Sequence, residues 1–133
     1  MTYRIPSKAS LEAAVLKVLR RSPAVGSLSR LTTMVAEEIE RTDPTARVGP
    51  ERIRRLVARS DHVRTTIHTR RGDAEGPPAR CPVCRGKLET VRNRTLSGGD
   101  IALNARCTEC SYWTGRERRV PVRYVFHLRE WRF

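Results

Sequence analysis

The 133-residue sequence lacks any hydrophobic run that approaches the roughly 18 residues of a membrane-spanning helix. Residues 1–6 also lack the continuous hydrophobic core of a secretory signal peptide. These two absences predict an intracellular, cytoplasmic protein with no membrane partner.

The sequence also lacks common signatures of catalysis. It contains no glycine-rich phosphate loop of the G-x-x-x-x-G-K type and no G-x-S-x-G nucleophile elbow. The three histidines, His62, His68 and His127, have no carboxylate or nucleophile at a spacing typical of catalysis, which favours surface or hydrogen-bonded core positions. We therefore expect that the protein is not an enzyme.

Lysine is nearly absent, although the chain is strongly basic. There are 27 basic and 14 acidic residues, a net charge of +13, and all the basic residues except Lys8, Lys17 and Lys87 are arginine. Arginine makes bidentate contacts with phosphates and base edges, which lysine does not. The composition therefore favours a nucleic-acid partner over a merely solvated basic surface. The charge is shared, because residues 1–70 carry +7 and residues 71–133 carry +6.

Cysteine is confined to two C-x-x-C pairs, Cys81 with Cys84 and Cys107 with Cys110, separated by 22 residues. This pattern predicts one tetrahedral site made of four thiolates, with zinc as the metal. Four thiolates leave no open position for water, so the predicted zinc is structural. In a reducing compartment such pairs favour metal ligands over disulfides. Iron in the same sulfur cage, as in rubredoxin, is the alternative occupant.

Hydrophobic periodicity predicts two helices in the first third of the chain. The first begins at a cap on Ser7 or Ser10 and ends near residue 21. Its predicted core face comprises Leu11, Ala14, Val15, Val18 and Leu19. The second begins at Ser27 or Ser29, after a turn over residues 22–26. Its outer face carries Glu37, Glu38 and Glu40, which would make it a poor surface for a polyanion.

A third helix is predicted from Pro50 to about Ser60, because proline suits the first turn of a helix. One side is hydrophobic, and the other carries Arg52, Arg54, Arg55 and Arg59. Like charges one turn apart repel by a few tenths of a kcal/mol per pair, roughly. We therefore expect an anionic partner on this side, the alternative being a solvated charged face.

Residues 62–69 are rich in β-branched side chains and predict a strand. The glycines and prolines of residues 70–78 predict a turn or linker, which can also be the tip of a wing. We place a helix-turn-helix or winged-helix lobe in residues 1–72 and a β-rich zinc ribbon with a C-terminal strand in residues 73–133. The predicted fold class is α+β.

In the second lobe, strands are predicted over residues 87–95 and 101–107, joined by a hairpin at residues 97–100. A third strand is predicted to start within residues 111–115. The last strand has one hydrophobic face, made of Val120, Val122, Tyr124, Phe126 and Leu128, which must pack on the ribbon or return to the first lobe. Candidate nucleic-acid contacts in this lobe are Arg92, Arg94, Arg118 and Arg119, the last two being either phosphate contacts or part of a solvated turn.

With these features the chain resembles the small archaeal winged-helix/zinc-ribbon nucleic-acid-binding proteins. The resemblance extends from about Ser7 to Cys110 and rests specifically on the four cysteines. It implies that the third helix binds nucleic acid through Arg52, Arg55 and Arg59. The chain is also similar to archaeal translation factors with a terminal ribbon, although here 23 residues follow Cys110.

Three functions remain open. The primary prediction is winged-helix DNA binding of the transcription-regulator or chromatin type, with the third helix in a major groove of duplex DNA. The second is a ribosome- or RNA-associated protein that binds folded ribosomal RNA by shape and phosphate, which the even division of charge favours slightly. The third is an adaptor that docks on a polymerase or a ribosome. The first two predict a nucleoid- or ribosome-associated location in the cytoplasm.

Overall fold

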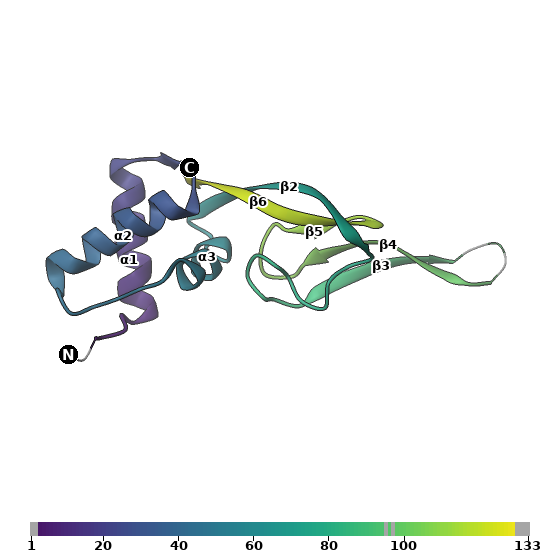
Figure 1. The fold of residues 1–133 in the computed structure, drawn as a ribbon, viewed down its shortest axis with the longest axis horizontal. Helices are drawn as coiled ribbons and strands as arrows, with labels where there is room; N and C mark the ends of the chain where they lie inside the picture. The colour runs from purple at the N-terminus through teal and green to yellow at the C-terminus, as the bar shows by residue number, and fades with distance from the viewer. Residues whose placement is uncertain (1–2, 95, 97, 130–133) are drawn as a thin grey trace. The chain divides into compact units, whose positions relative to one another are not determined.

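The computed structural model describes residues 3–94, 96 and 98–129, although not the side chains of 91–94 and 100–103 (Figure 1). Within those residues the chain is α+β, with three helices and two three-stranded sheets. It forms two compact units. We call residues 3–66 and 124–129 the helical unit, and residues 67–123 the cysteine unit.

Helix α1 (Lys8–Arg21) begins after Ser7, whose hydroxyl oxygen accepts a hydrogen bond from the Ser10 backbone N–H at 3.1 Å. This cap satisfies one of the donors that the first turn leaves unpaired. The predicted core face is confirmed, since its five members are the buried residues of α1: Leu11, Ala14, Val15, Val18 and Leu19.

Helix α2 (Leu28–Thr42) is capped in the same way by Ser27, which accepts from the Arg30 N–H at 3.1 Å. Helix α3 (Pro50–Ala58) follows Gly49 and has Pro50 in its first turn, as predicted. It buries Ile53 and Val57 against the other two helices.

Glu38 corrects one prediction about α2, because its side chain is buried instead of lying on an exposed acidic face. It is 6% exposed and lies 3.4 Å from Lys17, 2.7 Å from Arg21 and 3.5 Å from Arg41. Burial alone would raise the pKa of Glu38. The hydrogen bond from Lys17 and the three positive charges outweigh burial and hold its pKa below the ordinary value. Glu38 therefore links α1 to α2 as a carboxylate.

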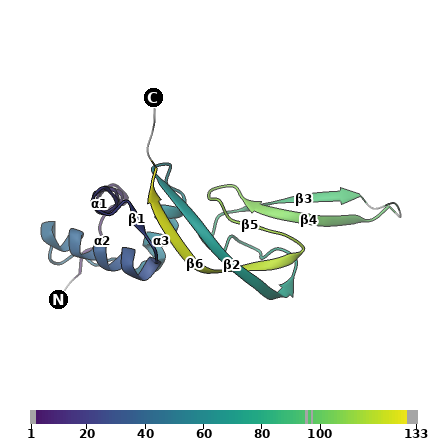
Figure 2. The same ribbon diagram turned by 90° about the horizontal axis from the view of Figure 1, so that it is seen from above.

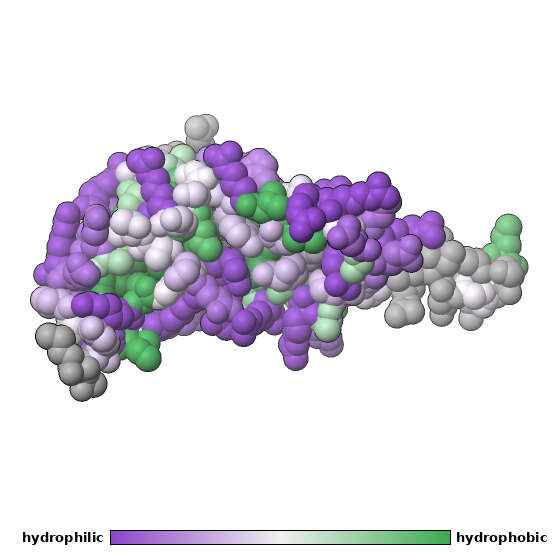
Figure 3. Space-filling view, viewed as in Figure 1, coloured by the Kyte–Doolittle hydropathy of each residue, from purple (hydrophilic) through white to green (hydrophobic). Residues whose placement is uncertain are grey.

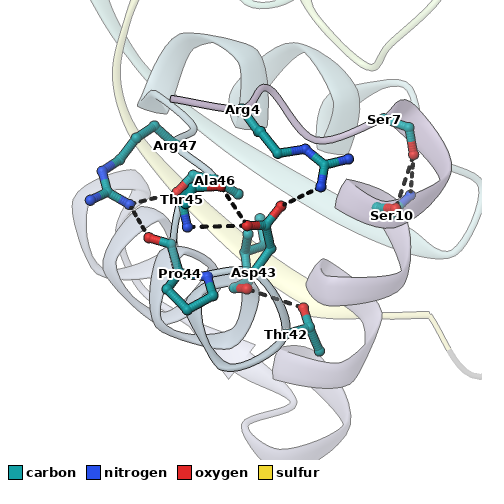
Figure 4. Close-up of polar contacts among 10 residues, drawn as sticks. Arg4, Ser7, Ser10, Thr42, Asp43, Pro44, Thr45, Ala46 and Arg47 are labelled. Atoms are coloured by element: carbon teal, nitrogen blue, oxygen red, sulfur yellow. Dashed lines mark hydrogen bonds and ion pairs between the residues drawn. The ribbon is translucent and has the colours of Figure 1, made fainter. Parts of the chain in front are cut away.

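The connection between α2 and α3 is fastened to the N-terminal segment (Figure 4). Asp43 accepts from the backbone N–H and the hydroxyl of Thr45, at 3.1 and 2.7 Å, and lies 3.6 Å from Arg4. The hydrogen bonds from Thr45, aided by the charge of Arg4, lower the pKa of Asp43. The Arg4 N–H also donates to the Thr45 carbonyl, and the Arg47 N–H donates to that of Arg4. These bonds fix the loop that leads into α3.

The first sheet has the strand order β1-β6-β2. Strand β1 (Ala24–Val25) pairs antiparallel with the end of β6 (Glu117–Leu128), so that Val25 lies opposite Phe126. Strand β2 (Val63–Glu75) is the other neighbour of β6. The Arg129 N–H donates to the His62 carbonyl at one end of this pair of strands. The two residues of β1 lie in a segment for which the sequence predicted only a turn.

Strand β2 also corrects the linker predicted over residues 70–78. The strand continues to Glu75, and the turn comes at Gly76, which has a left-handed φ of 78° and donates its N–H to the Arg116 carbonyl. The predicted lobe boundary between residues 72 and 73 therefore falls inside β2. A strand can include Gly72 here because its neighbour on β6 approaches closely. A Cβ at Gly72 would lie 2.9 Å from the Arg118 carbonyl oxygen.

The core of the helical unit combines side chains of all three helices with Phe126 of β6, which is fully buried. Tyr124 and Leu128 pack against the same cluster. Val122 is 56% exposed and Val120 is half-buried, so only the last part of the hydrophobic face predicted for this strand packs on the helices. Of the two packing partners that the sequence left open, the strand returns to the helices.

The second sheet, in the cysteine unit, has the order β3-β4-β5. Strand β3 (Leu88–Arg94) runs antiparallel beside β4 (Asp100–Cys107), as Figures 1 and 2 show. Gly98, with a φ of 89°, lies in the predicted hairpin turn between them. Strand β5 (Trp113–Thr114) pairs with β4 on its other side. Leu88 lies opposite Cys107, so this pairing places the hairpin beside the cysteines.

Hydrophilic side chains predominate on the face drawn in Figure 3. None of the helices in the described part of the chain is both long and apolar enough to cross a membrane.

Candidate metal centre

The sulfur atoms of Cys81, Cys84, Cys107 and Cys110 all lie within 4.8 Å of one another. The Cys81 and Cys110 sulfurs are 3.6 Å apart, and those of Cys84 and Cys107 are 3.5 Å apart. A tetrahedron with metal–sulfur bonds of about 2.3 Å has sulfur–sulfur edges of about 3.8 Å. None of the four forms a disulfide in the described part of the chain, and three of them are buried. The prediction that the cysteines form one site is confirmed, and the arrangement can hold one metal ion.

Each C-x-x-C pair lies in a turn that points backbone N–H groups at sulfur. In the first turn the Val83 N–H donates to Cys81 Sγ at 3.4 Å. In the second the Glu109 N–H donates to Cys107 Sγ at 3.3 Å. Hydrogen bonds of this kind favour the thiolate over the thiol, because they stabilise negative charge on sulfur. Both turns are thus prepared to present anionic ligands.

The chain after the first pair is shaped to leave the sulfurs room. Arg85 has a left-handed φ of 63°, and the Cys81 N–H donates to the Gly86 carbonyl at 3.0 Å. A Cβ at Gly86 would lie 3.2 Å from Cys84 Sγ and 3.1 Å from Cys107 Sγ. Glycine is therefore the residue that fits between the two C-x-x-C turns without displacing either of these sulfurs.

Hydrogen bonds between the cysteine sulfurs also shift the pKa values of the thiols. A hydrogen bond from Cys110 lowers the pKa of Cys81 to about 5, and the same bond raises the pKa of Cys110. Burial raises the pKa of Cys107. A divalent cation at the centre would replace the shared protons, since thiolates and not thiols bind metal. Metal binding at this site must therefore weaken as the pH falls.

The arginines predicted on the third helix lie together on α3 and at its C-terminal cap. Arg52, Arg54 and Arg55 are half-buried, whereas Arg59, the cap residue, is exposed. Arg54 lies 3.9 Å from Glu51, one turn earlier. One guanidinium nitrogen of Arg52, Nη1, is buried and has no hydrogen-bond partner among the residues that the structure describes.

The arginines predicted in the cysteine unit have different surroundings. Arg118 donates from Nε to the Gly76 carbonyl at 3.1 Å and from Nη2 to the Pro77 carbonyl at 3.3 Å. It thereby fastens the turn after β2. The Arg119 guanidinium lies 3.9 Å from the ring centroid of Trp113. The side chains of Arg92 and Arg94 lie outside the part of the chain that the structure describes, although their backbone belongs to β3.

A hollow of about 720 Å³ in the cysteine unit was not predicted from the sequence. We call it the arginine–tryptophan hollow. Its charged and aromatic lining consists of Arg70, Arg71, Glu75, Trp113, Arg116, Glu117 and Arg119. The signal available in the sequence was a tryptophan three residues before a basic run, which is typical of nucleic-acid-binding surfaces. The contribution of β2 was hidden because residues 70–78 were interpreted as a linker.

No protein-family model, no curated protein and no solved structure matches this chain. The resemblance to winged-helix/zinc-ribbon proteins therefore stays a prediction.

Proposed function

We propose that the protein binds nucleic acid, and that the helical unit is a winged-helix domain that binds duplex DNA as a transcription regulator or chromatin protein. The order of its elements, α1-β1-α2-α3-β2-β6, supports this proposal. In a winged helix the first strand of a small sheet follows the first helix, the other two strands follow the third helix, and the last strand lies between the other two. The order β1-β6-β2 agrees with that arrangement.

The observation that carries the proposal is the division of α3 into two sides. Ile53 and Val57 hold one side in the core. Three arginines, Arg52, Arg54 and Arg55, lie on the helix outside these two positions and Arg59 is its cap, with Glu51 the one acidic residue in the helix. An α-helix with its side chains is about 10–12 Å across, which fits a major groove about 12 Å wide. There Arg55 and Arg59 can contact phosphates or make bidentate bonds to guanine.

We infer that the four cysteines bind one zinc ion in a structural role. The sulfur-only donors and the closed tetrahedral spacing support zinc. The ion would hold the two C-x-x-C turns together and contribute folding free energy on the order of 10 kcal/mol in apparent terms. Iron is the alternative. A colourless protein with one equivalent of zinc per chain, measured by elemental analysis, would support zinc, whereas a red protein containing iron would contradict it.

Salt dependence tests the DNA-binding proposal. For a short duplex the logarithm of the binding constant should fall linearly with the logarithm of salt concentration, by about 0.9 per phosphate contacted. Arg55→Ala and Arg59→Ala should each weaken binding and reduce that slope by about 1. Arg20→Ala, an exposed arginine of α1, is the matched control and should keep the wild-type slope. Equal losses in all three variants would contradict a specific role for α3.

A second candidate function is binding to folded RNA, which the cysteine unit favours. By sequence, residues 67–123 carry 12 basic and 6 acidic residues, and the arginine–tryptophan hollow lies among them. If the protein fails to bind duplex DNA but co-sediments with ribosomes at low salt, RNA binding replaces the first proposal. An adaptor that uses only protein contacts would bind neither free DNA nor free RNA.

A further inference from the structure

We propose that the arginine–tryptophan hollow is a site for an unpaired nucleotide, whose base stacks on Trp113 while its phosphates contact arginines. This inference goes beyond duplex binding by α3 and does not depend on it. It assigns to the cysteine unit a second, single-stranded ligand.

Trp113 is the first observation. Its side chain is 49% exposed, although an indole ring usually buries most of its surface. The ring is held firmly in place. The preceding Tyr112 is buried and donates its hydroxyl to the Arg119 carbonyl at 2.6 Å. Arg119 in turn places its guanidinium 3.9 Å from the indole centroid. The result is a half-exposed indole with the Arg119 cation over one face, so a base would stack on the other face.

The charge around the ring is the second observation. Four arginines line the hollow, against Glu75 and Glu117. Glu117 already forms an ion pair with Arg71. Arg116 is exposed and has no side-chain hydrogen bond or ion pair to any residue that the structure describes. Exposed guanidinium groups bind phosphate bidentately, so the hollow offers phosphate contacts beside the aromatic ring.

The size of the hollow agrees with a nucleotide. Its volume of about 720 Å³ is within the roughly 300–1,000 Å³ of pockets that bind small ligands. A paired base in a duplex hides both faces against its neighbours and cannot reach a ring at the side of a pocket. An unpaired base has a free face, and stacking on an aromatic ring tolerates any base. The expected ligand is therefore a single-stranded segment or a loop, of RNA or DNA.

The metal centre positions this site. Cys107 donates its backbone N–H to the Tyr112 carbonyl at 2.9 Å, and β5, which contains Trp113, pairs with β4 directly before Cys107. The ring therefore depends on the fold of the second C-x-x-C turn. A single-stranded ligand would be bound only by the metal-loaded protein.

The test measures fluorescence of Trp113 in the full-length, metal-loaded protein. The chain has two tryptophans, so Trp131→Phe serves as the background. Titration with a ten-nucleotide oligo-dT should quench the fluorescence saturably, and the matching duplex should quench it much less. Oligo-U and free uridine monophosphate, as parallel ligands, distinguish RNA and mononucleotide from DNA.

Variants then separate stacking from general charge. In anisotropy measurements with labelled oligo-dT, Trp113→Ala should weaken binding about tenfold or more, and Trp113→Phe should retain most of it. Arg116→Ala should weaken binding and reduce the salt slope by about 0.7, the value for one phosphate of a single strand. Arg30→Ala, an exposed arginine of α2, is the charge-matched control and should bind as wild type.

Two results would overturn the proposal. One is equal affinity of Trp113→Ala and wild type for oligo-dT and oligo-U. The other is quenching by an oligo-glutamate peptide as strong as that by either oligonucleotide, which would indicate an acidic protein partner. Each variant must keep one metal ion per chain and the wild-type melting temperature. Arg55→Ala should leave single-strand binding unchanged, so failure here is distinguishable from failure of the duplex proposal.

Discussion

The helical unit buries fourteen hydrophobic side chains in one cluster. In the described part of the cysteine unit, the buried hydrophobic residues besides three cysteines are Val83, Ala105 and Tyr112. By sequence the two units carry nearly equal net charges, +7 for residues 1–66 with 124–133 and +6 for residues 67–123. Charge therefore does not distinguish them. The difference is that burial of hydrophobic surface can stabilise the first unit, whereas the second buries little besides its sulfur cluster.

Substitution of a cysteine of the sulfur cluster should have the largest effect on stability. It should affect the cysteine unit and leave the helical unit folded. Cys84→Ser should remove the metal and unfold the cysteine unit, a loss on the order of 10 kcal/mol in apparent terms. Hydrogen exchange should show loss of protection in β3 and β4 while α1 remains protected. Arg80→Ser, beside the first ligand, is the control and should keep both metal and protection. Unchanged metal content in Cys84→Ser would exclude the four-thiolate site.

Truncation of the returning strand should have the next largest effect, on the other unit. Phe126→Ala should destabilise the helical unit by about 3–5 kcal/mol, because it leaves a cavity in a fully buried cluster. Val122→Ala, on the same strand but 56% exposed, should change stability by less than about 0.5 kcal/mol. Chemical denaturation followed by circular dichroism measures both. Equal effects would mean that β6 is not part of the helical core.

Crowding between β2 and β6 should have an intermediate effect. Gly72→Ala places a Cβ 2.8 Å from the Val120 side chain and 2.9 Å from the Arg118 carbonyl oxygen, and should cost about 1–3 kcal/mol. Gly115→Ala would place its added carbon more than 4 Å from every described atom outside its two chain neighbours, and should be nearly neutral. Melting temperatures of the metal-loaded variants test this difference, and a neutral Gly72→Ala would contradict the observed strand pairing.

The buried carboxylate of the helical unit should give the smallest effect, because its partners Lys17, Arg21 and Arg41 are at least half exposed and screened by solvent. The pKa of Glu38 is lowered in the folded state. Its stabilisation is therefore complete above the ordinary carboxyl pKa and is lost as the pH falls through the folded pKa. Glu38→Gln should reduce stability at pH 7 and should make stability depend less on pH in the acid range. Glu37→Gln, on the exposed face, should keep the wild-type dependence of stability on pH.

The sequence predicted the helices well because their signals are local. The serine cap of α1 and its hydrophobic face follow from spacing within about four turns of one helix. The sulfur cluster was equally predictable, since identical C-x-x-C spacings leave few alternatives. Neither required knowledge of distant contacts.

The predictions that were wrong depended on distant contacts. Residues 70–75 contain a glycine and charged side chains and indicate a linker, but pairing with β6 makes them a strand. Glu38 is buried because cations from α1 surround it, a contact that the sequence of α2 does not reveal. The arginine–tryptophan hollow also required β2 and β6 together. Tertiary pairing overrode local propensity in each of these places.

The return of β6 to the helices also determines when, during protein synthesis, the helical core can be completed. A ribosome adds about 5–20 residues per second, so the 57 residues of the cysteine unit take roughly 3–11 s to make. All of them are translated before Phe126, the residue that completes the helical core. All four cysteines of the sulfur cluster therefore emerge earlier than the last residue of the N-terminal core. The nascent helices remain incompletely packed until a strand from beyond the cysteines is available.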